Sequence, residues 1–387
     1  MKPAKVIRDP IHGNISLSEL EVELVDTEQF QRLRNIKQNG FCYLVYPAMN
    51  STRFEHSLGV MHLAGILSYH LNLREKDKNL LRVAGLLHDI GHCAFSHTLD
   101  GIIKKSGHSH EENSSRIILK TEISDMLKKH GINPKEVSNL INGKGSLSKI
   151  ISSEIDIDKM DYLLRDSYYA GVAYGTIDLE RIIYSMRIIK DEIVINERGL
   201  EAVESLLIGR NMMYQTVYRH HTKRIAEAMF IKAVNTMIGL KKLTYSGLIK
   251  IDDIDLIEEL RNSKGYPKEM IDRIDKRKLF KTVLQEKLTN LPIESRKYLE
   301  NNIEKIEKEI ARGYKIKEGY VFINLPKAAM SEFKIRVEYD NELKFIDEVS
   351  NLAKSLEKSD QEKLTVNLIV DSRYVSKMKD FCIEDYL

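Results

Sequence analysis

Apolar residues recur at helical spacing through most of the first 240 residues, and this pattern predicts a mainly α-helical core. Residues 78–90 are the densest apolar stretch, and we expect a buried helix there that ends at Gly91. Residues 157–166 form a second predicted helix, and residues 200–240 predict long amphipathic helices. The helix at 157–166 carries one polar stripe at four-residue spacing: Asp158, Tyr162 and Asp166.

From about residue 245 the pattern changes to charged helices and strand-like runs. The expected helices cover residues 252–261, 294–311 and 345–356. The expected strands cover residues 320–324, 333–337 and 364–370, with earlier ones near 14–17 and 192–196. We therefore predict a helical core at residues 1–245 and a small α+β subdomain at residues 246–387.

Composition narrows the class of protein. The 60 basic and 57 acidic residues leave a net charge of +3, which gives no strong electrostatic case for nucleic acid or a membrane surface. Cys42, Cys93 and Cys382 are widely spaced, as expected in a reducing compartment. The sequence shows no signal peptide and no apolar run near 18 residues, so we expect a cytoplasmic protein.

Three separate segments offer metal-ligating side chains: His56, the pair His88 and Asp89, and Asp158. Imidazole suits transition metals, and carboxylates bind both these and harder cations. Asp89 follows a strongly apolar helix, where an ionised carboxylate needs a partner. Such a metal activates water and binds phosphate oxygens, so the set indicates a metal-dependent phosphohydrolase.

Each member of this set also has a simpler interpretation. Taken alone, His56 fits a hydrogen-bonded core histidine, and Asp158 fits a solvated helix residue. His88 and His92 share a helical face only if the helix continues for one more turn.

Longer stretches of the chain resemble a known family. The matching segments are residues 5–13, 26–34, 52–60, 88–92, 95–97, 110–111 and 156–162, followed by Arg210, Asn211 and Tyr218. They cover about the first 240 residues and resemble the HD-domain deoxynucleoside triphosphate triphosphohydrolases. The resemblance includes the catalytic domain of the vertebrate enzyme that carries a SAM domain ahead of its HD domain. It implies a helical HD-domain phosphohydrolase fold, with a catalytic core and an N-terminal regulatory segment within residues 1–245.

The resemblance also implies a reaction and a cofactor. In this family, water activated at a metal centre attacks the α-phosphorus of a nucleoside triphosphate and yields nucleoside and tripolyphosphate. The implied ligands are His56, His88, Asp89 and Asp158. Iron, manganese, nickel, cobalt or zinc would suit them, with magnesium on the substrate phosphates.

Further residues match catalytic positions of the family: His92, His97, Asp100, His110 and Glu111. His110 with Glu111 is expected to act as a charge-coupled pair, and Asp100 is expected to orient His97. The choice between His97 and His110 as the main general acid stays open.

The implied substrate contacts fall into two groups. The phosphate-binding cations are Arg53, Lys159 and Arg210, whose simpler role is a salt bridge. The residues around the sugar are Gln38, Tyr162, Asp166 and Tyr218. Asn39 departs from the leucine that is common there, which puts strict selection of deoxy sugars in doubt because an amide can accept a 2′ hydroxyl.

Lys5, Asp26 and Arg34 match positions that hold a guanine nucleotide activator, so GTP or dNTP activation in a homo-oligomer such as a tetramer is an expectation. The alternative is a structural role for these residues.

Two other functions remain open: an HD phosphohydrolase or phosphodiesterase acting on another nucleotide or phosphate ester, and a nucleic-acid-binding HD protein.

Overall fold

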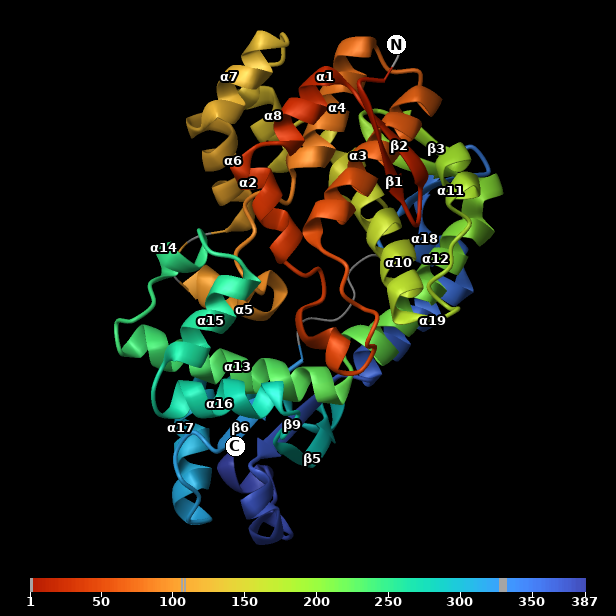
Figure 1. Ribbon diagram of the computed structural model, residues 1–387. Helices are drawn as coiled ribbons and strands as arrows, with labels where there is room; N and C mark the ends of the chain where they lie inside the picture. The colour runs from red at the N-terminus through yellow and green to blue at the C-terminus, as the bar shows by residue number, and fades with distance from the viewer. Residues whose placement is uncertain (1–2, 106, 108, 327–332) are drawn as a thin grey trace. The chain divides into compact units, whose positions relative to one another are not determined.

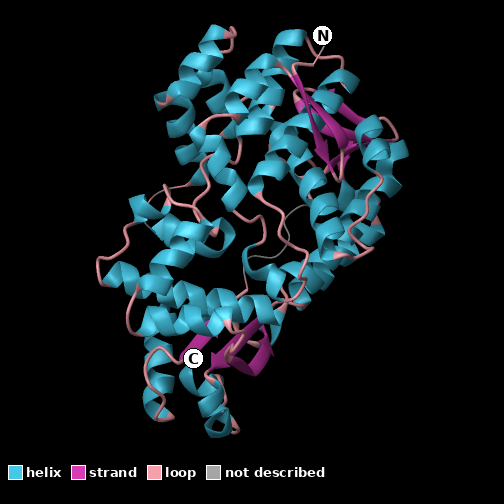
Figure 2. Ribbon diagram, viewed as in Figure 1, coloured by secondary structure: helices cyan, strands magenta, loops and turns pink. Residues whose placement is uncertain are grey.

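The computed structural model describes residues 3–105, 107, 109–326 and 333–387 (Figure 1). The fold is mainly helical, as predicted, and strands are few among the described residues (Figure 2). The chain divides into two compact units, each assembled from separated segments. The first unit comprises Met1–Tyr214, Thr244–Leu256 and Ser331–Lys354, and the second comprises Gln215–Leu243, Ile257–Met330 and Ser355–Leu387.

The first unit contains the helices that surround the candidate site. Its α-helices are α1 (Glu19–Val25), α2 (Glu28–Gln31), α3 (Arg53–His70), α4 (Glu75–Leu87), α5 (Ser96–Lys105), α6 (His110–Lys120), α7 (Glu122–Lys129), α8 (Pro134–Ile141), α9 (Ser148–Ile151), α10 (Ile157–Ala170), α11 (Leu179–Ser185), α12 (Leu200–Met213), α14 (Tyr245–Leu248) and α18 (Ile346–Val349). Its 3-10 helices are η1 (Arg32–Asn35), η2 (Gly40–Leu44) and η3 (Glu197–Gly199).

Helices α3, α4 and α10 pack together and form the centre of this unit (Figure 1). Helix α3 begins after Thr52, whose backbone N–H donates to the Glu55 carboxylate at 2.9 Å. Asp156 caps α10 by accepting from the Lys159 N–H, and Gly171 ends that helix in the left-handed conformation. These local signals fix where the functional segments begin and end.

Two small sheets complete the first unit. Strands β1 (Lys5–Asp9) and β2 (Gly13–Leu17) form an antiparallel hairpin. Strands β3 (Met186–Ile189), β4 (Glu192–Asn196), β7 (Arg336–Tyr339) and β8 (Glu342–Phe345) form a sheet in that order, with β4 and β7 parallel.

The second unit combines helices with an antiparallel sheet. Its helices include α13 (His221–Gly239), α16 (Tyr266–Asp275) and α17 (Ile293–Gly313), with the 3-10 helices η5 (Leu288–Asn290), η6 (Ser372–Met378) and η7 (Glu384–Tyr386). Strands β5 (Lys281–Lys287), β9 (Thr365–Val370) and β6 (Val321–Asn324) lie in that order in the sheet. Three elements cross between the units along the chain: η4 (Tyr214–Tyr218), α15 (Asp253–Asn262) and α19 (Asn351–Glu362).

The structure changes part of the prediction for the C-terminal third. The strand expected at 333–337 begins at Arg336, and its partners β4 and β8 belong to the first unit. The helix expected at 345–356 is two helices, α18 and α19, separated at Ser350. The compact units draw on segments from both sides of residue 245, because β-pairing returns later segments to the first unit.

Candidate functional site

Three helices bring together the side chains that the sequence singled out as metal ligands. His56 lies in the first turn of α3, His88 follows the last residue of α4, and Asp158 lies in the first turn of α10. The His56 Nε2 atom is 2.9 Å from Asp158 Oδ1, and the His88 Nε2 atom is 3.7 Å from the same oxygen. One ligand atom from each of the three residues lies within 4.8 Å of the others.

Asp89 joins this cluster from the residue after His88. Its Oδ1 atom is 3.3 Å from His88 Nε2, and its Oδ2 atom is 3.8 Å from His56 Nε2. Two ligands bound to one ion at about 2.1 Å each, with bond angles near 90–110°, are separated by roughly 3–3.5 Å. The spacing of the four predicted ligands therefore suits a single divalent ion.

The orientation of the two histidines also suits a metal. His56 Nδ1 donates to Asp161 Oδ2 at 2.7 Å, and His88 Nδ1 donates to the Gly85 carbonyl at 2.8 Å. Both Nε2 atoms are therefore left to the carboxylates of the cluster, where they are buried and make no well-oriented hydrogen bond with the described residues. Buried nitrogens without such a bond fit the role of metal ligands.

The electrostatics of the cluster favour a bound cation. Burial by itself would lower the pKa of His56, but the carboxylates of Asp158 and Asp161 prevail and raise it to about 10. Burial by itself would raise the pKa of Asp89, yet the Arg53 guanidinium and neighbouring histidines hold it well below its usual value. The carboxylates thus stay ionised, and a divalent ion would satisfy them.

The turn after α4 differs from the prediction. The helix ends at Leu87, and turn hydrogen bonds follow from Ile90 N–H to Leu87 and from His92 N–H to Asp89. His88 and His92 therefore do not share a helical face. Gly91 does not end a helix. A Cβ atom there would lie 2.2 Å from the Ser114 nitrogen, so the glycine allows α6 to approach closely.

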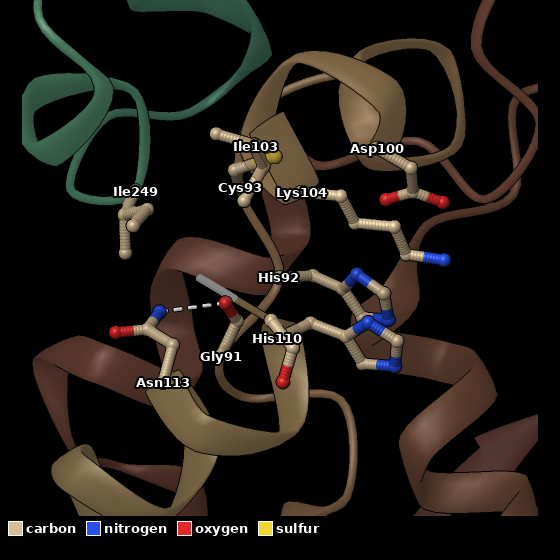
Figure 3. Close-up of a pocket in the computed structure, with 10 residues that line it drawn as sticks. Gly91, His92, Cys93, Asp100, Ile103, Lys104, His110, Asn113 and Ile249 are labelled. Carbon is tan, nitrogen blue, oxygen red and sulfur yellow. Dashed lines mark hydrogen bonds between the residues drawn. The ribbon is translucent and has the colours of Figure 1, made fainter. Parts of the chain in front are cut away.

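His92 meets His110 across that close approach. Their rings are stacked with centroids 4.1 Å apart and an interplanar angle of 15°, and Figure 3 shows the two rings one over the other. His92 Nε2 lies 3.1 Å from Asp89 Oδ1, and His110 Nε2 lies 3.2 Å from Glu111 Oε1. Burial and the Arg53 charge hold the pKa of His92 well below its usual value, so His92 stays neutral.

His97 and Asp100 lie on α5, with His97 Nδ1 3.7 Å from Asp100 Oδ2. The His97 side chain is 50% exposed, and its ring centroid is 6.1 Å from that of His92. Asp100, His92 and His110 line the same small pocket (Figure 3). The structure thus places three of the five predicted catalytic residues in this pocket. The other two, His97 and Glu111, lie next to members of it.

The predicted phosphate-binding cations make internal contacts. Arg53 is buried and donates to Asp89 and to the Ser96 hydroxyl. Lys159 Nζ donates to Asp156 Oδ2 and to the Ser153 carbonyl, both at 2.7 Å. Arg210 is buried on α12, and its Nη2 atom is 3.4 Å from the Tyr214 hydroxyl. Their binding of phosphates stays a prediction.

Of the residues predicted to surround the sugar, Asn39 and Asp166 are in contact. Asn39 Nδ2 donates to Asp166 Oδ1 at 2.7 Å. Asn39, which stands where leucine is common in the family, therefore contacts a residue that is predicted to bind the sugar. Gln38 is buried, and its Oε1 atom has no hydrogen-bond partner in the described part of the chain. Tyr162 is half-buried on α10, whereas Tyr218 belongs to the second unit.

The three predicted activator residues are exposed and lie on separate elements. Lys5 is in β1, Asp26 follows α1, and Arg34 is in η1. The Arg34 guanidinium lies 3.5 Å from the centroid of the Phe54 ring. Activator binding stays a prediction.

Several residues around the site were missed. Asp161 and His12 lie inside segments that resemble the family, but only the structure shows that they meet. Asp253 accepts from the backbone N–H groups of Lys37 and Phe95, and thereby joins two loops of the site. Arg32 donates to the carbonyls of Ile90 and His92. No local signal marked Asp253, because its partners lie more than 150 residues away.

Comparison with known proteins identifies the family. An HD domain matches residues 53–166, which contain all four clustered ligands, and an HD associated region matches residues 177–387. The chain belongs to the HD-domain family of metal-dependent phosphohydrolases. HD domains bind divalent metals, and the cluster of His56, His88 and Asp158 lies within this domain.

Relatives of this HD-domain chain match it over different shares of its length. It is 41% identical to the uncharacterized protein MJ1154 of Methanocaldococcus jannaschii, over 98% of this chain and 82% of that protein. It is 33% identical to the human deoxynucleoside triphosphate triphosphohydrolase SAMHD1, over 72% of this chain. The match covers 55% of the human protein, so the chain spans about half the length of that relative.

Solved structures share the fold over nearly the whole chain. A hypothetical protein from Aquifex aeolicus is 32% identical with a TM-score of 0.82, and the match covers 97% of this chain and 98% of that one. A phosphohydrolase from Bacteroides thetaiotaomicron is 26% identical with a TM-score of 0.78, covering 95% and 99%. Among the described helices of the present chain, none combines the length and apolar character that a membrane span needs.

Proposed function

We propose that this HD-domain chain hydrolyses nucleoside triphosphates at the α-phosphorus and releases nucleoside and tripolyphosphate. The observation that carries the proposal is the convergence of His56, His88, Asp89 and Asp158 beside the stacked pair His92 and His110. The similarity to proteins named deoxynucleoside triphosphate triphosphohydrolase, in human and in Dictyostelium discoideum, supports the choice of substrate.

The four ligands would hold a divalent ion, which supplies Lewis acidity and lowers the pKa of a bound water. Hydrolysis forms a bond from the water oxygen to the α-phosphorus and breaks the bond from that phosphorus to the 5′ oxygen. The bond electrons stay on the 5′ oxygen, which then needs a proton.

The neighbouring histidines have different roles in supplying this proton. His92 is buried and kept neutral, so it serves as a hydrogen-bonding group. His110 and His97 are partly exposed and each lies near a carboxylate, so either would serve as the general acid that protonates the 5′ oxygen. Arg53 donates to Asp89 at the metal cluster, where its guanidinium would offset phosphate charge.

Product analysis on the purified chain tests this proposal. Each of the four dNTPs and four NTPs is offered with manganese or magnesium, and products are separated by ion exchange. His88→Ala and Asp89→Ala are expected to lose bound metal and turnover together, whereas His110→Ala keeps metal and loses turnover. His130→Ala is the matched control, because His130 contacts Glu23 on α1, outside the cluster. Full activity in His88→Ala would overturn the site assignment.

We also propose that a nucleotide activator binds at Lys5, Asp26 and Arg34 between copies of the chain. The exposure of all three side chains supports this, since each remains available to a ligand shared with a second copy. Sedimentation with and without GTP or a dNTP mixture tests it. Nucleotide-dependent assembly that Arg34→Ala abolishes is the expected result, and assembly indifferent to nucleotide would contradict it.

A further inference from the structure

A buried polar network lies directly behind His56, on the side away from the metal cluster. Its centre is Asp161, whose side chain is fully buried one turn after Asp158 on α10. Asp161 accepts from His56 Nδ1 at 2.7 Å and from His12 Nε2 at 2.6 Å. It also accepts from Arg165 Nε and Nη2 at 2.8 and 2.9 Å.

We propose that Asp161 is a positioning residue that orients His56 for the metal, an inference that rests on the proposed metal-dependent function. A carboxylate can only accept here, so Asp161 holds a proton on Nδ1 of the His56 ring and turns the Nε2 atom toward Asp158 and Asp89, where its lone pair would serve a bound ion. A carboxylate behind a ligating imidazole also makes that imidazole a stronger donor to the ion.

The two histidine ligands differ in this respect. His88 donates its Nδ1 proton to the Gly85 carbonyl, which is a neutral acceptor within the same helical turn. His56 donates instead to a buried anion. Asp161 therefore gives His56 the more strongly oriented ring and the more basic Nε2 atom of the pair.

The chain keeps space open for this carboxylate. Gly59 lies one turn after His56 on α3, and a Cβ atom there would be 1.8 Å from Asp161 Oδ1 and 2.6 Å from Arg165 Nη2. Any larger residue would push Asp161 away from His56. The glycine is thus explained by the network rather than by a turn, because residue 59 is inside a helix.

The N-terminal hairpin closes the network from the other side. Asp9 Oδ1 accepts from the backbone N–H of Ile11 and of His12, which shapes the turn that presents His12. Asp9 Oδ2 accepts from Arg165 Nη1 at 2.8 Å. The hairpin β1–β2 therefore acts on the metal ligand through His12 and Asp161, although none of its residues belongs to the ligand cluster.

The test measures metal affinity rather than turnover. Cobalt(II) or manganese(II) is titrated into the apo-protein in competition with a chromophoric chelator, for the wild type, Asp161→Asn and Gly59→Ala. Loss of such an outer partner typically weakens metal binding by about 10–100-fold. We expect losses of that size in both variants, with a changed cobalt absorption spectrum that reports altered His56 ligation.

Gly65→Ala is the matched control on the same helix. Its added Cβ would meet the terminal Nη1 atom of the Arg82 side chain, which can move aside, so wild-type affinity is expected. His12→Ala covers the case in which Asp161→Asn fails to fold, because it leaves the Asp161–Arg165 pair intact. It should weaken metal binding about threefold or more, since one of the hydrogen bonds that hold Asp161 is lost.

The outcomes separate this inference from the proposed function. If His88→Ala abolishes metal binding while Asp161→Asn, or His12→Ala in its place, binds with wild-type affinity and an unchanged spectrum, the positioning role is overturned and the metal site stands. If His88→Ala itself binds metal normally, the metal site and the positioning role are both overturned.

Discussion

Gly91 offers a sharp test of how His92 and His110, the two stacked histidines of the predicted catalytic set, are held. Its N–H donates to the Ser114 hydroxyl at 3.0 Å. Its carbonyl accepts from Asn113 Nδ2 at 2.6 Å, the bond drawn in Figure 3. A Cβ atom at this position would lie 2.2 Å from the Ser114 nitrogen and 2.4 Å from the His110 carbonyl oxygen. Both are backbone atoms of α6, so Gly91→Ala forces the helix itself to move.

The expected cost follows from these contacts. Overpacking a tight interface costs about 1–3 kcal/mol. Weakening two buried hydrogen bonds adds about 1 kcal/mol each. We therefore expect Gly91→Ala to lower the free energy of unfolding by about 3–5 kcal/mol. Movement of α6 also separates His110 from His92, so turnover should fall at least tenfold while bound metal is retained.

Urea denaturation followed by circular dichroism measures the first effect, and turnover per bound metal measures the second. Gly101→Ala on α5 is the control, because a Cβ atom there meets nothing within 4 Å. It should raise stability by about 0.4–1 kcal/mol, as alanine does in an exposed helix. A Gly91→Ala protein within about 0.5 kcal/mol of the wild type would refute the reasoning, since that is the range of neutral surface substitutions.

Three further predictions concern charge, sugar selection and metal. Burial raises the pKa of Asp253 to about 6, above its unfolded value near 3.8, so its contribution to stability is complete at low pH and lost as pH rises through 6. The stability of Asp253→Asn relative to the wild type should therefore improve by about 2.5 kcal/mol between pH 4 and pH 8 in urea titrations, and a pH-independent difference would count against it. Asn39→Leu removes the amide bonded to Asp166 and should raise the ratio of dNTP to NTP turnover at least tenfold; an unchanged ratio would exclude this role. Removing metal by dialysis against a chelator should lower the free energy of unfolding by about 3 kcal/mol relative to protein at a hundredfold excess over Kd, and equal denaturation curves would contradict it.

The helices that carry the site were predictable because their signals are local. The apolar run at residues 78–90 and the polar stripe of residues 157–166 correspond to α4 and α10. The sheets were less predictable, since strand pairing depends on distant partners. The parallel pairing of β4 with β7 joins residues about 140 positions apart, and no local sequence pattern predicts it.

The candidate site likewise has residues that the sequence predicted and residues that only the structure shows. His56, His88, Asp89 and Asp158 could be proposed from residue type and motif, and the structure brings them together. The end of α4 was misjudged, because Gly91 serves the approach of α6 instead of stopping a helix. Asp161 and Asp253 were missed for a related reason: their partners come from other segments, so their roles exist only once the chain has folded.

The central claim is that one metal cluster in this HD-domain chain performs hydrolysis at the α-phosphorus. The most direct measurement is ³¹P NMR of a nucleoside triphosphate reaction run in ¹⁸O-water, with metal content determined for the same wild-type and His88→Ala samples. The account predicts tripolyphosphate that carries one ¹⁸O at its terminal phosphate, together with unlabelled nucleoside, in the wild type alone. Mono- or diphosphate products, or equal turnover in His88→Ala, would contradict it.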